Sequence, residues 1–153
     1  MLGRLVQKLC DLGDVHRVIL ALVQSRVELV GAIVDALNRA DVDGMLARMH
    51  PDFEWRPLEA SPVARVYRGH DEVRHYVEDW LGTLEGLRVE LEDPAEIGDR
   101  VVAQVRASGR GRASGVALDT GFCQVWTVRD EQALAMEEHA TREQGEAAAR
   151  RAG

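Results

Sequence analysis

Residues 38–81 carry their secondary-structure signals in the order helix, break, strand and helix, and this order restricts the possible folds most strongly. Asp41 can cap a short helix, and Pro51 ends it, because the residue before a proline is pushed out of the α region. Trp55 lies in a short stretch where apolar and polar residues alternate, as in a strand. Residues 70–84 then have the apolar spacing of an amphipathic helix.

After Gly86 the apolar period changes from that of a helix to that of a strand. This pattern predicts strands at 87–92, 100–108, 116–128 and 133–140. Glycine-rich and polar turns separate the last three strands, so we expect antiparallel hairpins. A chain with helices first and antiparallel strands after them is typical of an α+β fold.

The chain begins with a long apolar stripe at helical spacing that continues from Leu2 to Leu37. We expect one helix from about 14 to 40, with residues 1–26 forming a helical extension to the main domain. This extension can pack on a second copy of the chain or lie over its own domain, and the sequence leaves both open. From Thr141 the polar, alanine-rich sequence predicts a short frayed helix, and residues 148–153 are expected to form a flexible tail.

Charge and composition exclude several classes of partner. The formal net charge of -7 disfavours binding to nucleic acid. No apolar run approaches the roughly 20 residues that a membrane span needs, and no secretory pattern is present. The two cysteines have no metal-ligand or redox spacing. We therefore expect a soluble, cytoplasmic protein that needs no metal and no cofactor.

Two polar residues interrupt apolar strand faces, which is where functional groups are to be expected. Glu138 shares a strand face with Met136, and Gln124 lies between Phe122 and Trp126. If their strands form a hairpin, the carboxyl and the amide lie close together in one apolar concavity. Burial raises the pKa of a carboxyl and suits it to acid–base chemistry, while an amide can orient water or stabilise an oxyanion.

Two structural alternatives exist for Glu138. It can pair with a nearby arginine such as Arg106, which would leave no chemistry. A slip of one residue in the strand register would instead turn it to solvent. Asp52 is a third catalytic candidate, although carboxylates after a helix break commonly make turn or cap hydrogen bonds. Candidate substrate-binding side chains are large and apolar: Trp55, Tyr76, Trp80, Phe122, Trp126 and Met136.

With these segments placed, the chain resembles a SnoaL-like member of the nuclear-transport-factor-2-like superfamily over about 27–147. The matching motifs are Asn38-Arg39-Ala40-Asp41, His50-Pro51-Asp52-Phe53-Glu54-Trp55, Tyr67-Arg68-Gly69-His70, Val125-Trp126-Thr127-Val128 and Glu138-His139. The resemblance implies a cone-shaped, curved antiparallel sheet wrapped around helices, with a deep apolar pocket. It also implies a homodimer formed through the convex face of the sheet.

The resemblance assigns roles to three residues, and two departures limit them. Glu138 falls where epoxide-hydrolase-like relatives carry a catalytic aspartate. Gln124 falls near the protonated oxyanion-hole aspartate of ketosteroid isomerases, and Asp52 falls near their general base. The helix position of the isomerase tyrosine is Ile33, however, and the Arg-x-Asp pair of the epoxide hydrolases is Arg106-Ala107-Ser108 here.

Together these observations predict a homodimeric protein that binds a small, mainly apolar molecule. If it is an enzyme, we expect cofactor-free acid–base chemistry of the cyclase, isomerase or hydrolase type, with Glu138 as the acid or base. The alternative is a non-catalytic ligand-binding or dimerising module of the same fold. Fold alone does not decide between them.

Overall fold

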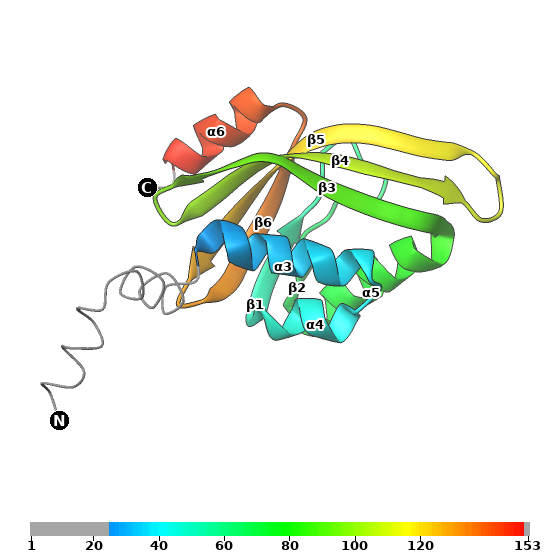
Figure 1. The fold of residues 1–153 in the computed structure, drawn as a ribbon, viewed down its shortest axis with the longest axis horizontal. Coiled ribbons are helices and arrows are strands. Elements are labelled where there is room, and N and C mark those ends of the chain that lie inside the picture. Colours follow the sequence, from blue (N-terminus) through cyan, green and yellow to red (C-terminus); the bar gives the residue numbers. More distant parts are fainter. Residues whose placement is uncertain (1–24, 152–153) are drawn as a thin grey trace, which may run out of the picture.

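The computed structural model describes residues 25–151, which form a curved, open sheet of six strands with helices on both sides (Figure 1). The strands are β1 (Met49–Arg56), β2 (Tyr67–Arg68), β3 (Leu84–Ile97), β4 (Arg100–Gly111), β5 (Ala117–Arg129) and β6 (Gln132–His139). Their order across the sheet is β2-β1-β6-β5-β4-β3. Neighbours are antiparallel except β1 and β6, which are parallel. The α+β prediction is confirmed.

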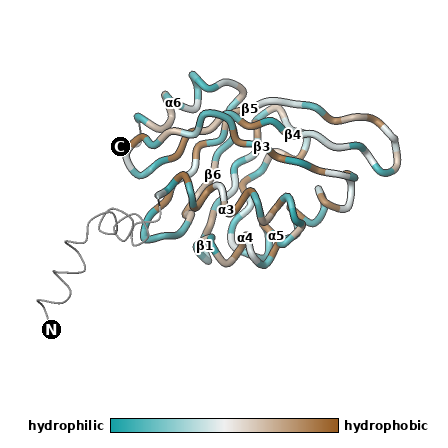
Figure 2. The backbone as a smooth tube through the Cα atoms, viewed as in Figure 1, coloured by the Kyte–Doolittle hydropathy of each residue, from teal (hydrophilic) through white to brown (hydrophobic). Residues whose placement is uncertain are grey.

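Three helices lie on the concave side of the sheet, and one lies on the convex side (Figure 1). The concave helices are α3 (Arg26–Asn38), α4 (Val42–Ala47) and α5 (Gly69–Thr83). Helix α6 (Arg142–Arg151) contacts β4 and β5 from the convex side. Hydrophobic residues occur along the central strands (Figure 2). Consecutive residues are buried at 101–103 in β4 and at 123–126 in β5, and because successive side chains point to opposite faces, the sheet is buried against both helical layers.

Helix α3 begins later than the sequence pattern predicts. Ser25 has extended backbone angles and its Oγ accepts a hydrogen bond from the Glu28 N–H at 3.0 Å, which makes it the N-cap. A single helix from about 14 to 40 is therefore wrong, because the helix starts at Arg26 and ends at Asn38. The predicted extension 1–26 lies almost wholly outside the described residues.

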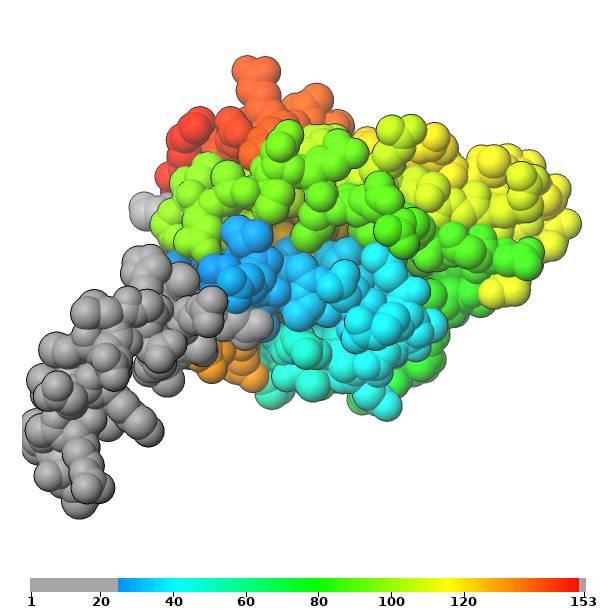
Figure 3. Space-filling view, in the orientation of Figure 1, coloured from blue at the N-terminus to red at the C-terminus, as the bar shows by residue number. Residues whose placement is uncertain are grey.

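The C-terminus of α3 is fixed to the edge strand of the sheet. The Asn38 side-chain amide donates to the Val89 carbonyl oxygen and accepts from the Val89 N–H, both at 2.8 Å. These bonds satisfy backbone groups on β3, which has only one neighbouring strand. Figure 3 shows α3 lying directly against β3 on this face of the molecule. The contact holds one side of the concave layer closed.

Strand β1 begins at Met49, four residues before the short strand that the alternation at Phe53 and Trp55 predicts. Its register with β6 shifts between Met49 and Glu54, on either side of Pro51. A proline has no N–H to donate to a ladder, so the pairing is interrupted there. Helix α4 ends at Ala47, before Pro51 is reached, so Pro51 acts inside β1, where it interrupts the regular pairing, rather than at the helix end.

The β5–β6 hairpin has the register on which the functional prediction depends. Arg129 pairs with Gln132, so Asp130 and Glu131 form a two-residue turn, and both have positive φ, 51° and 62°. The same register places Gln124 directly opposite Glu138. The predicted hairpin is confirmed, and it brings both polar residues to the concave side.

The C-terminal segment is a packed helix. In α6, Ala149 is buried against Val102 and Val125 on the convex side of the sheet. Gly145 is also buried, beside the sulfur of Cys123. The prediction of a flexible tail is thus wrong for 148–151, because small apolar residues give α6 a face that fits the sheet.

Candidate functional site

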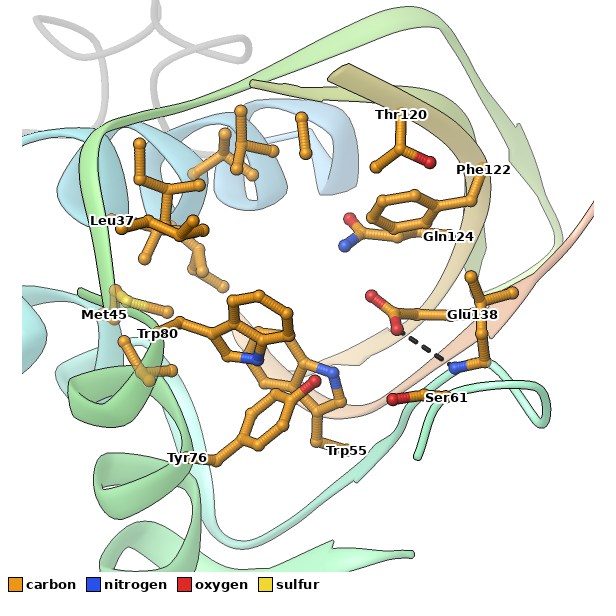
Figure 4. A pocket seen from close by; sticks show the side chains of 18 of the residues that line it. Leu37, Met45, Trp55, Ser61, Tyr76, Trp80, Thr120, Phe122, Gln124 and Glu138 are labelled. Atoms are coloured by element: carbon orange, nitrogen blue, oxygen red, sulfur yellow. Dashed lines mark hydrogen bonds between the residues drawn. The ribbon is translucent and has the colours of Figure 1, made fainter. Parts of the chain in front are cut away.

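A cavity of about 210 Å³ lies between the concave face of the sheet and α3, α4 and α5 (Figure 4). Most of its lining is apolar. Helices α3 and α4 contribute Ile33, Val34, Leu37 and Met45, and α5 contributes Tyr76, Val77 and Trp80. The sheet contributes Trp55, Leu84, Leu87, Val89, Ala107, Leu118, Thr120, Phe122, Gln124, Trp126 and Glu138, and the loop after β1 contributes Leu58 and Ser61.

Glu138 is the one carboxylate in this lining. Its Oε1 accepts a hydrogen bond from the Leu58 N–H at 3.2 Å, and within residues 25–151 it forms no ion pair. Burial raises the pKa of Glu138 from its ordinary 4.5 to about 7, although the Leu58 N–H and the neighbouring Gln124 amide oppose the shift. The side chain can therefore hold or release a proton near neutral pH.

Neither structural alternative for Glu138 is observed. Arg106 points to the opposite side, where its Nη2 lies 3.0 Å from Asp119 Oδ2 in an exposed ion pair. The register that turns Glu138 to solvent is also absent, because Glu138 lines the cavity opposite Gln124. Figure 4 shows the Glu138 carboxyl and the Gln124 amide extending side by side into the cavity.

Gln124 is 5% exposed, and a tryptophan fixes the orientation of its amide. The Nε1–H of Trp126 donates to Gln124 Oε1 at 3.0 Å. An indole nitrogen can only donate, so the oxygen of the amide must face Trp126. The Nε2 group then remains as a donor for the cavity. Trp126 thus acts as a positioning residue for Gln124.

Tyr76 provides a second neutral donor, from helix α5. Burial raises the pKa of Tyr76 to about 12, and the charge of Glu138 adds to the shift. The phenol therefore stays protonated at physiological pH. Its ring packs edge-on against Trp55, with centroids 5.2 Å apart, and against Trp80 at 6.3 Å. Ile33 also lines the cavity, so α3 provides no hydroxyl at the position of the isomerase tyrosine.

Two predicted site residues do not lie in the cavity. Asp52 is on the irregular part of β1, its side chain is 93% exposed, and its Oδ2 lies 4.0 Å from His50 Nδ1. Met136 faces the concave side but is fully buried in the core, opposite Trp126 in the hairpin register. The other predicted wall residues, Trp55, Tyr76, Trp80, Phe122 and Trp126, do line the cavity.

Sequence reasoning did not assign the helix residues that close the cavity from the other side. Ile33, Val34 and Leu37 follow one another at helical spacing, and that stripe was the available signal. Leu58 and Ser61 lie in the loop between β1 and β2. Nothing in their residue types marks them, because their position depends on how the loop folds over β6.

Two further findings concern metal ions and membranes. Among residues 25–151, no three His, Cys, Asp or Glu side chains are grouped so that they could hold a metal ion. No helix within that range is long and apolar enough to cross a membrane.

The family is shown by comparison with known proteins. The model of the SnoaL-like domain matches residues 30–136, well over half of the chain. The chain belongs to the SnoaL-like domain family. The match ends two residues before Glu138, so membership of this family does not by itself assign a role to that carboxyl. No curated protein is significantly similar to the chain in sequence.

Solved structures agree with this SnoaL-like domain in fold. An NTF2-like protein from Burkholderia thailandensis E264 is 26% identical, with a TM-score of 0.69, over 81% of this chain and 98% of the other. TerC, co-crystallised with polyporic acid, is 25% identical, with a TM-score of 0.66, over 81% and 97%. A protein from Catenulispora acidiphila DSM 44928 with a ketosteroid isomerase-like fold, in complex with trimethylamine, is 12% identical, with a TM-score of 0.66, over 73% and 84%.

Proposed function

We propose that this SnoaL-like domain is a cofactor-free acid–base enzyme that acts on a small, mainly apolar molecule. Glu138 transfers the proton, and Gln124 binds the oxygen on which charge develops. One observation supports this most strongly: a carboxyl without an ion-pair partner in the described chain extends into an otherwise apolar cavity beside an oriented amide. Structural carboxylates are normally paired or solvated, so this arrangement favours a catalytic role for Glu138 over a structural one.

The protonation states suit both directions of proton transfer. A carboxyl with a pKa of about 7 can act as a base when ionised and as an acid when protonated, and both forms are populated at neutral pH. The Gln124 Nε2 group and the Tyr76 hydroxyl are neutral donors. Hydrogen bonds from such donors strengthen as negative charge develops on a substrate oxygen. The same set serves cyclisation, isomerisation or addition of water.

The relatives support a small organic ligand but not one reaction. TerC was crystallised with polyporic acid, and the Catenulispora protein holds trimethylamine. These two molecules differ in charge and size. The fold therefore accommodates diverse small molecules, and for this chain the ligand has to be inferred from its own cavity.

A generic proton-transfer reaction tests the role of Glu138 without the natural substrate. In the elimination of 5-nitrobenzisoxazole, a base removes the ring C–H proton, the N–O bond breaks, and its electron pair remains on the phenolate oxygen. We expect the full chain to catalyse this reaction, with a rate that rises as pH passes about 7. Glu138→Gln should lower the rate about 100-fold or more.

The matched control is Glu137→Gln, because Glu137 is the adjacent residue and contacts His139, outside the cavity lining. It should leave the elimination rate unchanged. If Glu138→Gln retains the wild-type rate, Glu138 is not the proton-transfer group. If neither protein accelerates the reaction over buffer, the proposal of an acid–base enzyme loses its support.

The second candidate is a non-catalytic carrier or dimerising module. A cavity filled by stacked tryptophans would favour the dimerising module, but Trp55 packs on Tyr76, Trp126 packs on Phe53, and the cavity stays open. An open cavity suits a carrier as well as an enzyme, and the elimination assay separates these two. Homodimer formation remains a prediction. Comparing the solution mass of the full chain with that of a chain lacking residues 1–24, which keeps the Ser25 cap of α3, tests whether the extension is required for it.

A further inference from the structure

The loop between β1 and β2, residues 57–66, forms a thin wall of the cavity. Leu58 and Ser61 line the cavity, whereas Glu59 and Ala60 between them are exposed to solvent. The Ser61 N–H donates to the Leu58 carbonyl oxygen at 2.9 Å, so this part of the loop is a compact turn. One segment of chain therefore separates the cavity from solvent here.

The two ends of the β1–β2 loop are held differently. Near β2, the Tyr67 hydroxyl donates to the Val63 carbonyl oxygen at 3.0 Å. Near β1, the Leu58 N–H donates to Glu138 Oε1 at 3.2 Å, the bond drawn as a dashed line in Figure 4. In the described part of the chain, no other hydrogen bond joins residues 58–62 to a helix or strand. The half of the loop that lines the cavity is thus held by the carboxyl proposed to transfer the proton.

The strength of this bond depends on the charge of Glu138. A hydrogen bond from a backbone N–H to a carboxylate is roughly twice as strong as one between neutral groups. When the carboxyl takes up a proton, the bond from Leu58 weakens. The same bond opposes the rise in the pKa of Glu138 that burial causes. The loop and the proton are therefore coupled, and the coupling is reciprocal.

Deepening the acid–base function proposed above, on which this step rests, we infer that the Leu58 N–H is a positioning group that couples the β1–β2 loop to proton transfer. Ionised Glu138 holds the loop against the cavity, and protonated Glu138 releases it. The bond also occupies Oε1, so the other oxygen, which points toward Gln124 in Figure 4, exchanges the proton with the substrate. Proton uptake from the substrate then loosens the wall through which the product leaves.

Within the cavity, Glu138 is the one group that can change its charge near neutral pH. From β5 it faces the uncharged amide of Gln124. From α5 it faces the phenol of Tyr76, whose pKa of about 12 keeps it protonated. The other lining residues, from α3, α4, β1, β3, β4 and the loop, carry no titratable side chain.

The charged groups next to Glu138 in sequence and within the loop lie outside the cavity lining. Glu137 and His139 flank it on β6 and contact each other, with Nε2 of the histidine 3.3 Å from Oε1 of the glutamate. In the loop, Glu59 is exposed, and Arg65 forms an ion pair with Glu72 at 3.3 Å. A variant at His139 is therefore the control for a second titrating group.

The Leu58 amide resonance of the full chain, uniformly labelled with nitrogen-15, tests this inference. We expect its proton to move upfield as pH falls from 9 to 5, because the hydrogen bond weakens, with a midpoint near 7. Its hydrogen exchange, corrected for the intrinsic effect of pH, should become about ten-fold faster or more. The Val89 amide is the internal control, because it donates to the Asn38 side-chain oxygen at 2.8 Å, an acceptor that does not titrate.

Glu138→Gln should abolish the titration of the Leu58 amide, and His139→Gln should retain it. A Leu58 amide that does not titrate in the wild type overturns the inference. So does a titration that persists in Glu138→Gln or disappears in His139→Gln.

Replacing Leu58 with leucic acid, its α-hydroxy counterpart, removes the N–H but keeps the side chain. We expect this ester to move the midpoint of the pH–rate profile of the elimination above that of the wild type, because the lost bond favours ionised Glu138. The matched control is lactic acid at Ala60, whose N–H donates to no group in the described chain. An unmoved midpoint overturns the positioning role, and if the ester fails to fold, the wild-type titration of the Leu58 amide still decides.

These outcomes are distinct from failure of the proposed enzyme. A Leu58 amide that titrates with Glu138 in a protein without elimination activity refutes the enzyme and upholds the coupling of loop and charge. Elimination that requires Glu138, with a Leu58 amide that does not titrate, refutes only the coupling.

Discussion

Glu138 should make the stability of the protein depend on pH in an unusual direction. Its pKa is raised on folding from 4.5 to about 7, so between these values the folded chain holds a proton that the unfolded chain has released. The free energy of unfolding therefore falls as pH rises through this window. The shift corresponds to a loss of up to about 3 kcal/mol between pH 4.5 and 7. An ordinary paired carboxylate would act in the opposite sense.

Urea denaturation of the wild type and Glu138→Gln at pH 5, 6, 7 and 8 measures this effect. The glutamine variant cannot ionise, so its free energy of unfolding should not fall with rising pH. Between pH 5 and pH 8 the variant should therefore gain about 2–3 kcal/mol of stability relative to the wild type. Glu137→Gln serves again as the control and should follow the wild-type profile. Parallel profiles for wild type and Glu138→Gln would show that Glu138 is not desolvated by folding.

Single residues also show which parts of the site a sequence can reveal. Glu138 and Gln124 were predictable because each interrupts an apolar strand face, and strand periodicity fixes the face. The exposed position of Asp52 was not predictable, because Pro51 disturbs the register of β1 at the residues whose alternation would have indicated the face. The hydrogen bond from Leu58 to Glu138 leaves no sequence signal at all, since it depends on how the loop folds over β6.

Among the secondary-structure elements, the β5–β6 hairpin matters most, because it places Gln124 opposite Glu138. Its two turn residues, Asp130 and Glu131, both have positive φ, which L-residues adopt at some cost. Glycine has no such cost, and Asp-Gly is a favoured sequence for this type of turn. We expect Glu131→Gly to raise the free energy of unfolding by about 1 kcal/mol.

The control for the turn is Glu131→Ala, which removes the same carboxylate but keeps a Cβ and should give no such gain. Thermal and urea unfolding of both variants provide the comparison. The elimination rate should stay at the wild-type value in each, because the exposed turn lies outside the cavity lining. A glycine variant no more stable than the alanine variant would contradict the strain argument.

Helix ends were predicted less well than strand faces, and caps explain the difference. The apolar stripe continues through Ser25, so periodicity alone joins two segments that the cap separates. The combination of Ser25 with Glu28 three residues later was the available signal. For α6 the signal was weaker, because alanine and glycine are compatible with both a solvated tail and a tightly packed helix.

In the whole molecule, the sheet buries residues on both faces, and the two faces pack against different partners. The concave face surrounds the cavity, while α6 covers Val102, Cys123 and Val125 on the convex face. The resemblance places the dimer contact of related proteins on that convex face. A second copy could use only the part that α6 leaves open, so the packing of α6 controls how much apolar surface the convex face exposes.

Gly145 is the residue that tests this packing, because a Cβ at its position would meet the Cys123 sulfur. We expect Gly145→Ala to lower the free energy of unfolding by about 1–3 kcal/mol through overpacking, despite the better helix propensity of alanine. Cys123→Ala alone should cost about 1 kcal/mol or slightly more for the lost sulfur. In the double variant the clash with the sulfur is gone and only a tight contact with Val125 remains, so it should be more stable than Gly145→Ala alone. Urea denaturation gives the four free energies, and light scattering shows whether the loosened helix promotes association. Strictly additive losses would contradict a close contact between Gly145 and Cys123, and α6 would then be held to the convex face by Ala149 instead.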